Sequence, residues 1–504
     1  MHYPKSLLGI AILALLASSC IKDHDIQNPA PGEDAATFKE VAQIDLGESG
    51  ASEISAYDPT TKRLFTVNNA DKALIDVLDL SAFPTVTKLQ SIDESALGGV
   101  ANSVAVSDGK LAIALEATNK QANGSVIVVN TSTLGQIKQI AVGALPDMVI
   151  FSPDGKYIVT ANEGEPNSDY SVDPEGSVSI INVTDNYSVR TLTFGAFAGS
   201  VAQLAQEGFR IFGPKATFAQ DVEPEYVAIS DDSKKAFVTL QENNGVAEVD
   251  IISGTITKLH GLGTKDYSLT ANGIDPSDRD NKIELGPWPV RSFYQPDGIT
   301  YFTHNGLSYL ITANEGDARD YSTFAEEARI GSSSVKLDPT AFPDAATLKK
   351  NENLGRLKIT NTLGDTDGDG DYDILYGFGG RGFSIINAAN FQLVYEPGKT
   401  LEEEVIRAGS YDDDRSDDKG VEPENVTVGM VGGKPIAFIA LERANAVALY
   451  DLTNPIIPRF LKILKVGIGP EGIAFVSADK SPNKKSLLVV SNEVDGTVRF
   501  YQPD

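Results

Sequence analysis

Residues 146–163, PDMVIFSPDGKYIVTANE, contain the pattern that decides the fold. An acidic residue follows a proline, a short apolar run leads to the turn Pro153-Asp154-Gly155, and a second run ends in an Asn-Glu pair. Valine, isoleucine, threonine and aromatic residues favour strands, and Asp-Gly favours a tight turn between two of them. The stretch therefore predicts a β-hairpin with a carboxylate at the start of its first strand and another at the end of its second.

The same pattern recurs along the chain. Clear copies occupy residues 224–242, 296–315, 423–442 and 470–493, and weaker copies begin at Glu53 and Asn102. A third apolar strand usually follows each pair, as in SVSIINV, VAEVDI and AVALYDL. Seven units of three or four antiparallel strands predict an all-β fold, a seven-bladed β-propeller. An array of β-sandwiches is the alternative.

The two ends of the chain predict how the ring closes. The sequence ends at Asp504, directly after the third strand of the last unit, and FKEVAQIDL at residues 38–46 precedes the first unit. We expect this N-terminal segment to supply the outer strand of the last blade, which removes an open sheet edge. One propeller would then span residues 37–504, although length alone suggests about three domains.

Propeller topology brings the acids of the repeat together. The start of the innermost strand and the end of the second strand of each blade lie at the same mouth of the central channel. We expect an acidic funnel there that binds a divalent cation or a cationic group, because crowded carboxylates otherwise repel one another. The alternative for each acid is to cap backbone N–H groups at a strand end. The predicted ring comprises Asp147, Glu163, Glu225, Glu242, Asp297, Glu315, Glu424, Glu442, Glu471 and Glu493.

Insertions lengthen the loops of this same face. They comprise residues 163–175, 194–224, 261–296, 317–380 and 408–423. Long loops on a rigid scaffold commonly carry function. The funnel face is therefore the predicted binding surface for a ligand whose identity the sequence does not reveal.

The longest insertion contains a motif with the spacing D-x-D-x-D-G, which is typical of a calcium loop. Its predicted ligands are Asp365, Asp367, Asp369, Asp371 and Asp373. Position 12 of the loop is Tyr376 rather than a bidentate glutamate, so the shell is incomplete or another residue completes it. A solvated acidic turn is the alternative. The nearby acids of residues 412–418 predict either a second cation site or a solvated loop.

The N-terminus predicts export and membrane attachment. Lys5 precedes an apolar run over residues 7–16, which is the length of a signal peptide and too short to span a bilayer. Ala17-Ser18-Ser19 before Cys20 resembles a bacterial lipobox. We expect residues 1–19 to be removed, Cys20 to carry lipid, and residues 20–36 to act as a tether. The protein would then be an outer-membrane or cell-surface lipoprotein of a Gram-negative bacterium. A plain secretory signal is the alternative.

Composition excludes several functions. The 504 residues include 42 Lys+Arg and 70 Asp+Glu, a net charge of −28, which argues against nucleic acid as a partner. The single cysteine excludes a disulfide within the chain and a cysteine-rich zinc site. The motifs G-x-S-x-G and H-E-x-x-H and the P-loop do not occur in the sequence. We expect a monomer that binds calcium.

Arginines within or beside the inserted loops keep one enzymatic alternative open. Arg291, Arg319 and Arg381 could hold a phosphate beside metal-bound carboxylates, as a calcium-dependent phosphoesterase requires. Arg329 and Arg415 lie in similar positions. Simple pairing of these arginines with carboxylates is the other interpretation.

Several segments resemble the choice-of-anchor I family, which is related to the mesenchyme-specific cell-surface glycoproteins. They are ANEGEPNSDY (161–170), GFRIFGP (208–214), DVEPEYVAIS (221–230), ANEGDARDY (313–321), DTDGDGDYDILYGFGGRGFSI (365–385) and RSDDKGVEPENV (415–426). The resemblance covers nearly all of residues 37–504 and implies a secreted or surface-anchored propeller. Some relatives are alkaline-phosphatase-like or are joined to phosphoesterase domains. Because a fold does not imply a function, the resemblance supports the architecture more than any activity.

Overall fold

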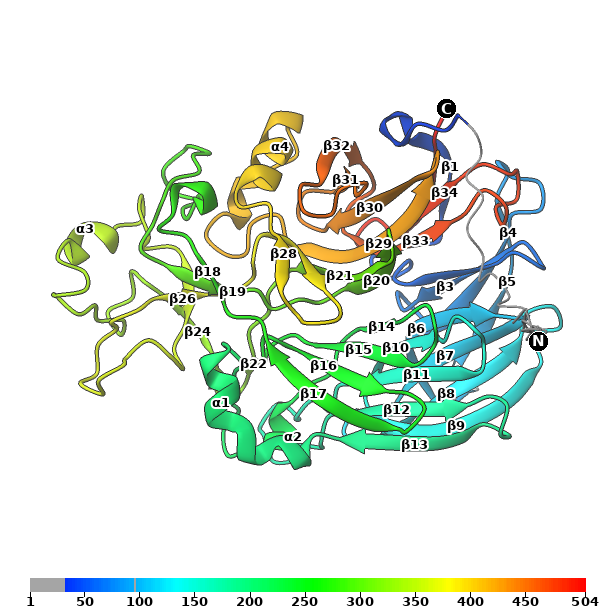
Figure 1. The fold of residues 1–504 in the computed structure, drawn as a ribbon, viewed down its shortest axis with the longest axis horizontal. Helices are drawn as coiled ribbons and strands as arrows, with labels where there is room; N and C mark the ends of the chain where they lie inside the picture. Colours follow the sequence, from blue (N-terminus) through cyan, green and yellow to red (C-terminus); the bar gives the residue numbers. More distant parts are fainter. Residues whose placement is uncertain (1–31, 95–96) are drawn as a thin grey trace, which may run out of the picture.

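The computed structural model describes residues 32–94 and 97–504. The predicted signal peptide, Cys20 and most of the predicted tether lie outside these residues. Within them, seven four-stranded antiparallel sheets surround a central channel (Figure 1). The innermost strands of consecutive blades contact each other around the whole ring, including the last with the first. The prediction of a seven-bladed β-propeller is confirmed.

Each blade has four strands, ordered below from the channel outward. The first three blades are β2(Ser55–Asp58)–β3(Arg63–Asn68)–β4(Leu74–Asp79)–β5(Thr87–Asp93), β6(Gly99–Ser107)–β7(Lys110–Ala117)–β8(Asn123–Asn130)–β9(Gln136–Ala144) and β10(Pro146–Phe151)–β11(Tyr157–Asn162)–β12(Ser177–Asn182)–β13(Ser188–Thr193). The next three are β14(Val227–Ile229)–β15(Lys235–Leu240)–β16(Gly245–Asp250)–β17(Thr255–Gly261), β20(Ile299–His304)–β21(Leu307–Asn314)–β27(Gly382–Asn387)–β28(Leu393–Tyr395) and β29(Pro423–Val431)–β30(Lys434–Leu441)–β31(Ala446–Asp451)–β32(Arg459–Lys465). The seventh is β33(Pro470–Val476)–β34(Leu487–Asn492)–β35(Thr497–Gln502)–β1(Lys39–Asp45).

The seventh blade joins the two ends of the described chain. Strand β1 pairs antiparallel with β35, with Ala42 opposite Phe500 and Ile44 opposite Val498. The predicted closure by the N-terminal strand is therefore confirmed. It gives β35 a partner on each side and leaves no unpaired edge on that strand.

Hydrophobic clusters between neighbouring blades form the core. Such a cluster lies at each of the seven junctions of the ring. The second strand of a blade is buried on both faces because another blade covers each of them; in β11, only the first of six residues is partly exposed. This explains why these strands read as continuous apolar runs rather than as an alternation of apolar and polar residues.

The insertions fold into ordered structure on one side of the ring, at the left of Figure 1. Two of them build a lobe from β18(Thr264–Asp266), β19(Arg291–Phe293) and β26(Tyr376–Gly377), the pairs β22(Asp320–Tyr321)–β23(Phe324–Ala325) and β24(Glu327–Arg329)–β25(Lys358–Thr360), and the short helices η4(Thr270–Asn272) and α3(Ala345–Leu348). The lobe has its own apolar core, which includes Tyr267, Leu337 and Leu354. The expectation of plain loops thus misses a small folded unit, because its core residues are scattered without a regular period.

The remaining helices of the described residues are short. They include η1(Ala35–Thr37), η3(Gly195–Ser200), α1(Val201–Gln206), α2(Phe218–Asp221), α4(Thr400–Ala408) and η5(Asp413–Arg415). Among the residues that the structure describes, no helix has the length and apolar character needed to cross a bilayer.

Two glycines that follow acids of the repeat allow adjacent inner strands to approach closely. A Cβ on Gly472 would lie 2.3 Å from the carbonyl oxygen of Glu53, in the neighbouring blade. A Cβ on Gly298 would lie 2.8 Å from the Cα of Asn425. The Gly298 N–H also donates to the carbonyl oxygen of Glu424, at 3.0 Å. These contacts hold the starts of the inner strands together at the mouth of the channel.

We predict that Gly472→Ala lowers the free energy of unfolding by about 1–3 kcal/mol, because the added methyl group meets backbone atoms that cannot move without displacing a blade. Gly195→Ala is the matched control, since a Cβ there meets no atom within 4 Å. Urea denaturation followed by circular dichroism measures both. An equal effect of the two substitutions would contradict the close approach of the inner strands as the cause.

Candidate functional site

A cavity of about 120 Å³ lies at the channel mouth where the inner strands begin. Six carboxylates of the predicted ring line it: Asp147, Glu225, Asp297, Glu315, Glu424 and Glu471. They come from five consecutive blades, and Asn102 takes the equivalent position in the second blade. The repeat therefore brings polar side chains from six of the seven blades to a common point.

Three of these carboxylates are close enough to bind one ion. Asp297, Glu315 and Glu424 can each offer an oxygen so that all three atoms lie within 4.8 Å of one another. Asp297 precedes β20, Glu315 follows β21, and Glu424 lies in β29 of the next blade. The Glu315 carboxylate also accepts a hydrogen bond from Gln241 Nε2, at 2.8 Å. Such an oxygen-rich set has the chemistry that hard cations prefer.

Burial and mutual repulsion disfavour the charged form of these acids. Burial raises the pKa of Asp297 and Glu424 well above their ordinary values, and the nearby Glu315 raises both further. The pKa of Glu225 and of Glu471 is raised in the same way. Burial also raises the pKa of Asp147 to about 7, with a contribution from Glu165. Protons or a cation are needed to compensate this concentration of negative charge.

One lysine supplies part of that compensation. Lys419 Nζ lies 3.0 Å from Glu315 Oε1, 3.6 Å from Glu422 Oε2 and 3.7 Å from Asp317 Oδ1. Glu422 is fully buried, and Arg415 Nη2 pairs with it at 2.6 Å. These cations lie on one side of the cavity. We call Asp297, Glu315 and Glu424 the triad. Among the described residues, Glu315 is the only acid of the triad that forms an ion pair.

Apart from Glu315, the acids that end the second strands lie around the cavity rather than on its wall. Glu163 and Glu242 are close enough to Glu225 to raise its pKa. Glu442 forms an ion pair with Arg443 at 2.9 Å and has a pKa raised to about 7, mainly by burial. The backbone N–H of Glu493 donates to the carbonyl oxygen of Gly469 at 2.8 Å. The predicted ring therefore consists of an inner set at the cavity and an outer set behind it.

Two of the three arginines predicted to hold phosphate are buried. Arg319 donates to the carboxylates of Asp221 and Glu223 and to the Asp221 carbonyl oxygen. Arg381 donates to the carbonyl oxygens of Asp275, Ser416 and Asp418 and lies 3.5 Å from Glu402 Oε1. Arg291 is half exposed on the lobe, 3.8 Å from Asp266. Protein oxygens occupy the two buried guanidinium groups, which favours structural pairing over phosphate binding.

Asp412 and Asp414 are exposed, whereas two other acids of residues 412–418 are paired with basic side chains. Asp417 is buried and pairs with Arg329 and with Arg356. Asp418 pairs with Lys358 at 2.9 Å and with Arg415 at 3.2 Å. Both predicted alternatives for this cluster are wrong for these two residues, because basic side chains, most of them distant in sequence, pair with them.

The predicted calcium loop brings its acids into two groups. Asp365, Asp367 and Asp373 can each place one carboxylate oxygen so that the three atoms lie within 4.8 Å of one another. Asp371 and Asp373 can do the same with Asp338. The Asp365 carboxylate accepts N–H groups from Gly368 at 2.7 Å and from Gly370 at 3.0 Å, which folds the loop around it. Asp369 belongs to neither group. Asp338 lies beside the loop because its N–H donates to the Tyr372 carbonyl oxygen at 3.0 Å.

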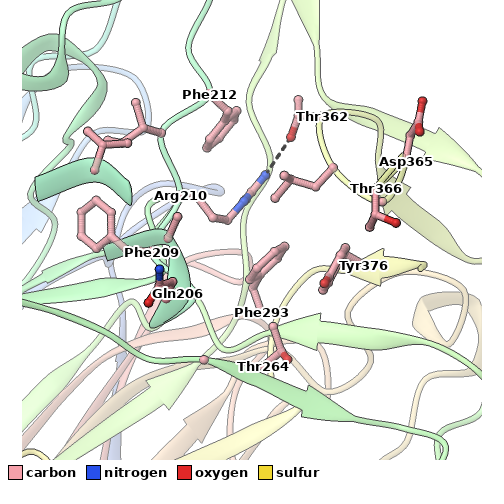
Figure 2. Close-up of a pocket in the computed structure, with 17 residues that line it drawn as sticks. Gln206, Phe209, Arg210, Phe212, Thr264, Phe293, Thr362, Asp365, Thr366 and Tyr376 are labelled. Carbon is pink, nitrogen blue, oxygen red and sulfur yellow. Dashed lines mark hydrogen bonds between the residues drawn. The ribbon is translucent and has the colours of Figure 1, made fainter. Parts of the chain in front are cut away.

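A larger cavity of about 420 Å³ lies between α1 and the start of this loop (Figure 2). Phe209, Phe212, Phe293 and Tyr376 line it together with Arg210, whose guanidinium lies 4.1 Å from the Phe212 ring centre and 4.6 Å from that of Phe293. Asp365 and Thr366 of the loop lie at its edge (Figure 2). Its volume is within the range of ligand-binding pockets.

Several residues of these sites have no signal in the repeat pattern. Lys419 and Glu422 lie in an insertion, and Asp338 lies far from the motif that it joins. Glu53 begins a weak copy of the repeat but is absent from the predicted ring; its pKa is raised to about 8, mainly by burial and also by Glu493 and Asp147. The isolated lysine in RSDDKG, within a strongly acidic stretch, is the one local sign of a counter-charge.

Comparisons with known proteins identify relatives. A sequence model of the choice-of-anchor I domain matches residues 53–455. Gigasin-3a of Magallana gigas is 28% identical over 182 residues, which cover 29% of this chain and 64% of that protein. The mesenchyme-specific cell surface glycoprotein of Strongylocentrotus purpuratus is 25% identical over 329 residues, which cover 57% of this chain and 41% of that protein. The chain thus spans less than two thirds of either relative.

Solved structures with a related arrangement are more distant in sequence. A chain of Kuenenia stuttgartiensis hydrazine synthase has a TM-score of 0.49 and 14% identity, over 92% of this chain and 97% of that chain. The β-propeller domain of Myceliophteria thermophila Cps50 (Swd1) has a TM-score of 0.47 and 9% identity, over 93% of this chain and all of that domain. The strand pairing itself therefore carries the fold assignment.

We predict that the cation-free protein loses stability as the pH rises from 6 to 8. The pKa of Glu53 is raised to about 8 and that of Asp147 to about 7, so in this range the folded state binds more protons than the unfolded state. The stabilisation is present at low pH and is lost as the pH passes through these values. Buried His260, whose pKa is lowered to about 4, acts in the opposite direction but is a single group.

Scanning calorimetry in EDTA measures this dependence. Glu53→Gln should flatten the slope, whereas Glu48→Gln, at an exposed acid, should leave it unchanged. A melting temperature that stays constant or rises between pH 6 and pH 8 would show that these buried acids do not control the stability.

Proposed function

The chain belongs to the choice-of-anchor I family, and we propose that it is a lipid-anchored surface protein whose propeller binds a divalent cation at the acidic mouth of its channel. The name of the Strongylocentrotus purpuratus relative describes a cell-surface protein, which supports a surface location here. The lipobox-like residues before Cys20 support lipid attachment. Cys20 lies outside the described residues, so this part of the proposal stands on the sequence.

The convergence of Asp297, Glu315 and Glu424 carries the cation proposal. Their oxygens lie within 4.8 Å of one another beside a cavity with three further carboxylates. Lys419 compensates only the Glu315 side. A bound cation would replace the protons that the crowded acids otherwise need and would convert their repulsion into coordination. Ca²⁺ fits better than Mg²⁺, because several carboxylates and an amide can supply its larger oxygen shell.

The loop in the lobe is the second proposed cation site. Asp365, Asp367 and Asp373 would bind the ion there, and Asp338 is a candidate for the ligand that replaces the missing glutamate at position 12. The cavity of about 420 Å³, which we call the aromatic pocket, shares Asp365 with this loop and lies on the funnel side. We therefore expect the unidentified ligand of the protein to bind there. This gives a binding module with two cation sites of different roles, one in the channel and one beside the pocket.

We predict that calcium titration by calorimetry resolves two classes of site in the chelator-treated protein. Asp297→Asn should remove the channel site and Asp367→Asn the loop site. Asp169→Asn, at an exposed acid of the same face, is the matched control and should change neither. Saturation of one site at about 100 times its Kd stabilises the folded protein by about 2.7 kcal/mol, and the melting temperature should rise accordingly.

Asp297→Asn has a second expected effect. Without calcium, it should raise the melting temperature at pH 8, because one of the repelling charges is gone. A calcium response that is unchanged in Asp297→Asn would refute the channel site, whatever happens at the loop.

Membrane attachment is tested in cells. We predict that the protein sediments with the membrane fraction and that Cys20→Ser releases it to the soluble fraction, because a diacyl or triacyl anchor is far stronger than other contacts of a folded surface. Ser19→Ala, next to the cysteine and still small, should sediment like the unchanged protein. A membrane-bound Cys20→Ser variant would refute the anchor.

A further inference from the structure

The face of the propeller opposite the acidic funnel carries an apolar patch. Ile456 and Ile457, in the turn between β31 and β32, are 62% and 71% exposed. Leu307, in the turn between β20 and β21, is 54% exposed. The turn Asn454-Pro455-Ile456-Ile457-Pro458 holds its two isoleucines between prolines, so they remain directed to solvent at little loss of conformational freedom. Clustered exposed apolar residues mark a contact surface.

The described chain begins at this same face. The Glu33 carboxylate accepts hydrogen bonds from the N–H and the hydroxyl of Ser486, at 2.8 and 2.6 Å. Ser486 lies in the turn between β33 and β34, which is on the face opposite the funnel. The Glu33 carbonyl also lies against Gly432, in the turn between β29 and β30. The first described residues therefore lie beside the turns of the sixth and seventh blades.

Polar contacts connect the patch to these turns. His304 Nε2 lies 3.1 Å from the Thr453 carbonyl oxygen, which joins the Leu307 turn to the Ile456 turn. Lys434 and Arg459 both pair with Asp451, at 3.5 and 3.2 Å, which joins the Ile456 turn to the turn beside Glu33. We call the surface formed by residues 304–307, 432–434, 452–459 and 477–486 the tether face.

The tether face is basic although the whole chain is strongly acidic. Lys434 and Arg459 are more than half exposed. Lys484 and Lys485, in the turn that contains Ser486, are also exposed. The acid between the first two, Asp451, is buried beneath them. Exposed isoleucines ringed by lysine and arginine fit a surface with an apolar interior and anionic headgroups.

We infer that the tether face rests on the lipid bilayer that holds Cys20, with Ile456 and Ile457 entering the interface and the basic side chains contacting lipid phosphates. The inference rests on the proposed lipid anchor. Cys20 precedes the first described residue, Gly32, by twelve positions, a reach of at most about 40 Å, so the anchor holds this face near the membrane. The tether alone leaves the orientation open, and the patch fixes it. The acidic funnel and the lobe then point away from the membrane.

Site-specific fluorescence tests the orientation. The mature chain with Trp288→Phe is coupled through the Cys20 thiol to vesicles of phosphatidylethanolamine and phosphatidylglycerol, roughly 3:1, that contain a maleimide lipid. A tryptophan is introduced by Ile457→Trp or, as the matched control, by Val172→Trp; Val172 is 51% exposed in an insertion of the funnel face. Lipids brominated on their acyl chains quench only a tryptophan that enters the interface.

We predict strong quenching for Ile457→Trp and none for Val172→Trp. The uncoupled Cys20→Ser chain should bind the same vesicles only weakly, too weakly to sediment with a membrane fraction, and Ile456→Ser with Ile457→Ser should lower its partition coefficient about tenfold. Quenching of neither tryptophan, or of Val172→Trp alone, would overturn the inference and leave the patch for a protein partner. Because the coupling is chemical, this result is independent of lipidation in cells, so failure of the anchor and failure of the orientation are distinguishable.

Discussion

The repulsion among carboxylates at the channel mouth is the constraint on which the site depends. Two like charges about 4 Å apart interact by about 4 kcal/mol at an effective dielectric constant near 20, and six carboxylates line a cavity of about 120 Å³. Within residues 32–94 and 97–504, Lys419 is the one lysine that pairs with an acid of the triad. An arrangement of this kind persists only if protons or a cation occupy it, and the raised pKa values of Asp297 and Glu424 express the same requirement.

The propeller topology brings these carboxylates together, and buried ion pairs hold the insertions against the ring. Most blades begin with an acid at the same topological position, and glycines such as Gly298 and Gly472 let the inner strands converge. The basic side chains of the insertions neutralise acids elsewhere: Arg319 joins Asp221 and Glu223, and Arg381 anchors the residues around Asp418 to the ring. Buried pairs of this sort hold the lobe against the propeller, because loss of either partner leaves an unpaired buried charge.

Much of the fold was accessible from the sequence because it repeats. The hairpin of residues 146–163 defined the unit, and its copies specified seven blades, the closing strand and the convergence of Asp147, Glu225, Asp297, Glu424 and Glu471. The lobe was not accessible, since Tyr267, Leu337 and Leu354 meet only after distant insertions fold together. For the same reason, the repeat could not identify Lys419 beside Glu315, Asp338 beside the calcium loop, or the buried pairing of Arg319 and Arg381. Local sequence patterns predict the strands and their repeat. Contacts between residues that are distant in sequence become visible only in the structure.

Anomalous diffraction from crystals grown with calcium addresses the cation site at the channel mouth most directly. We expect an anomalous peak among Asp297, Glu315 and Glu424, within coordination distance of their carboxylate oxygens, in addition to any peak at residues 365–373. A channel mouth without such a peak, with Asp297 and Glu424 joined by a shared proton, would contradict a cation site there.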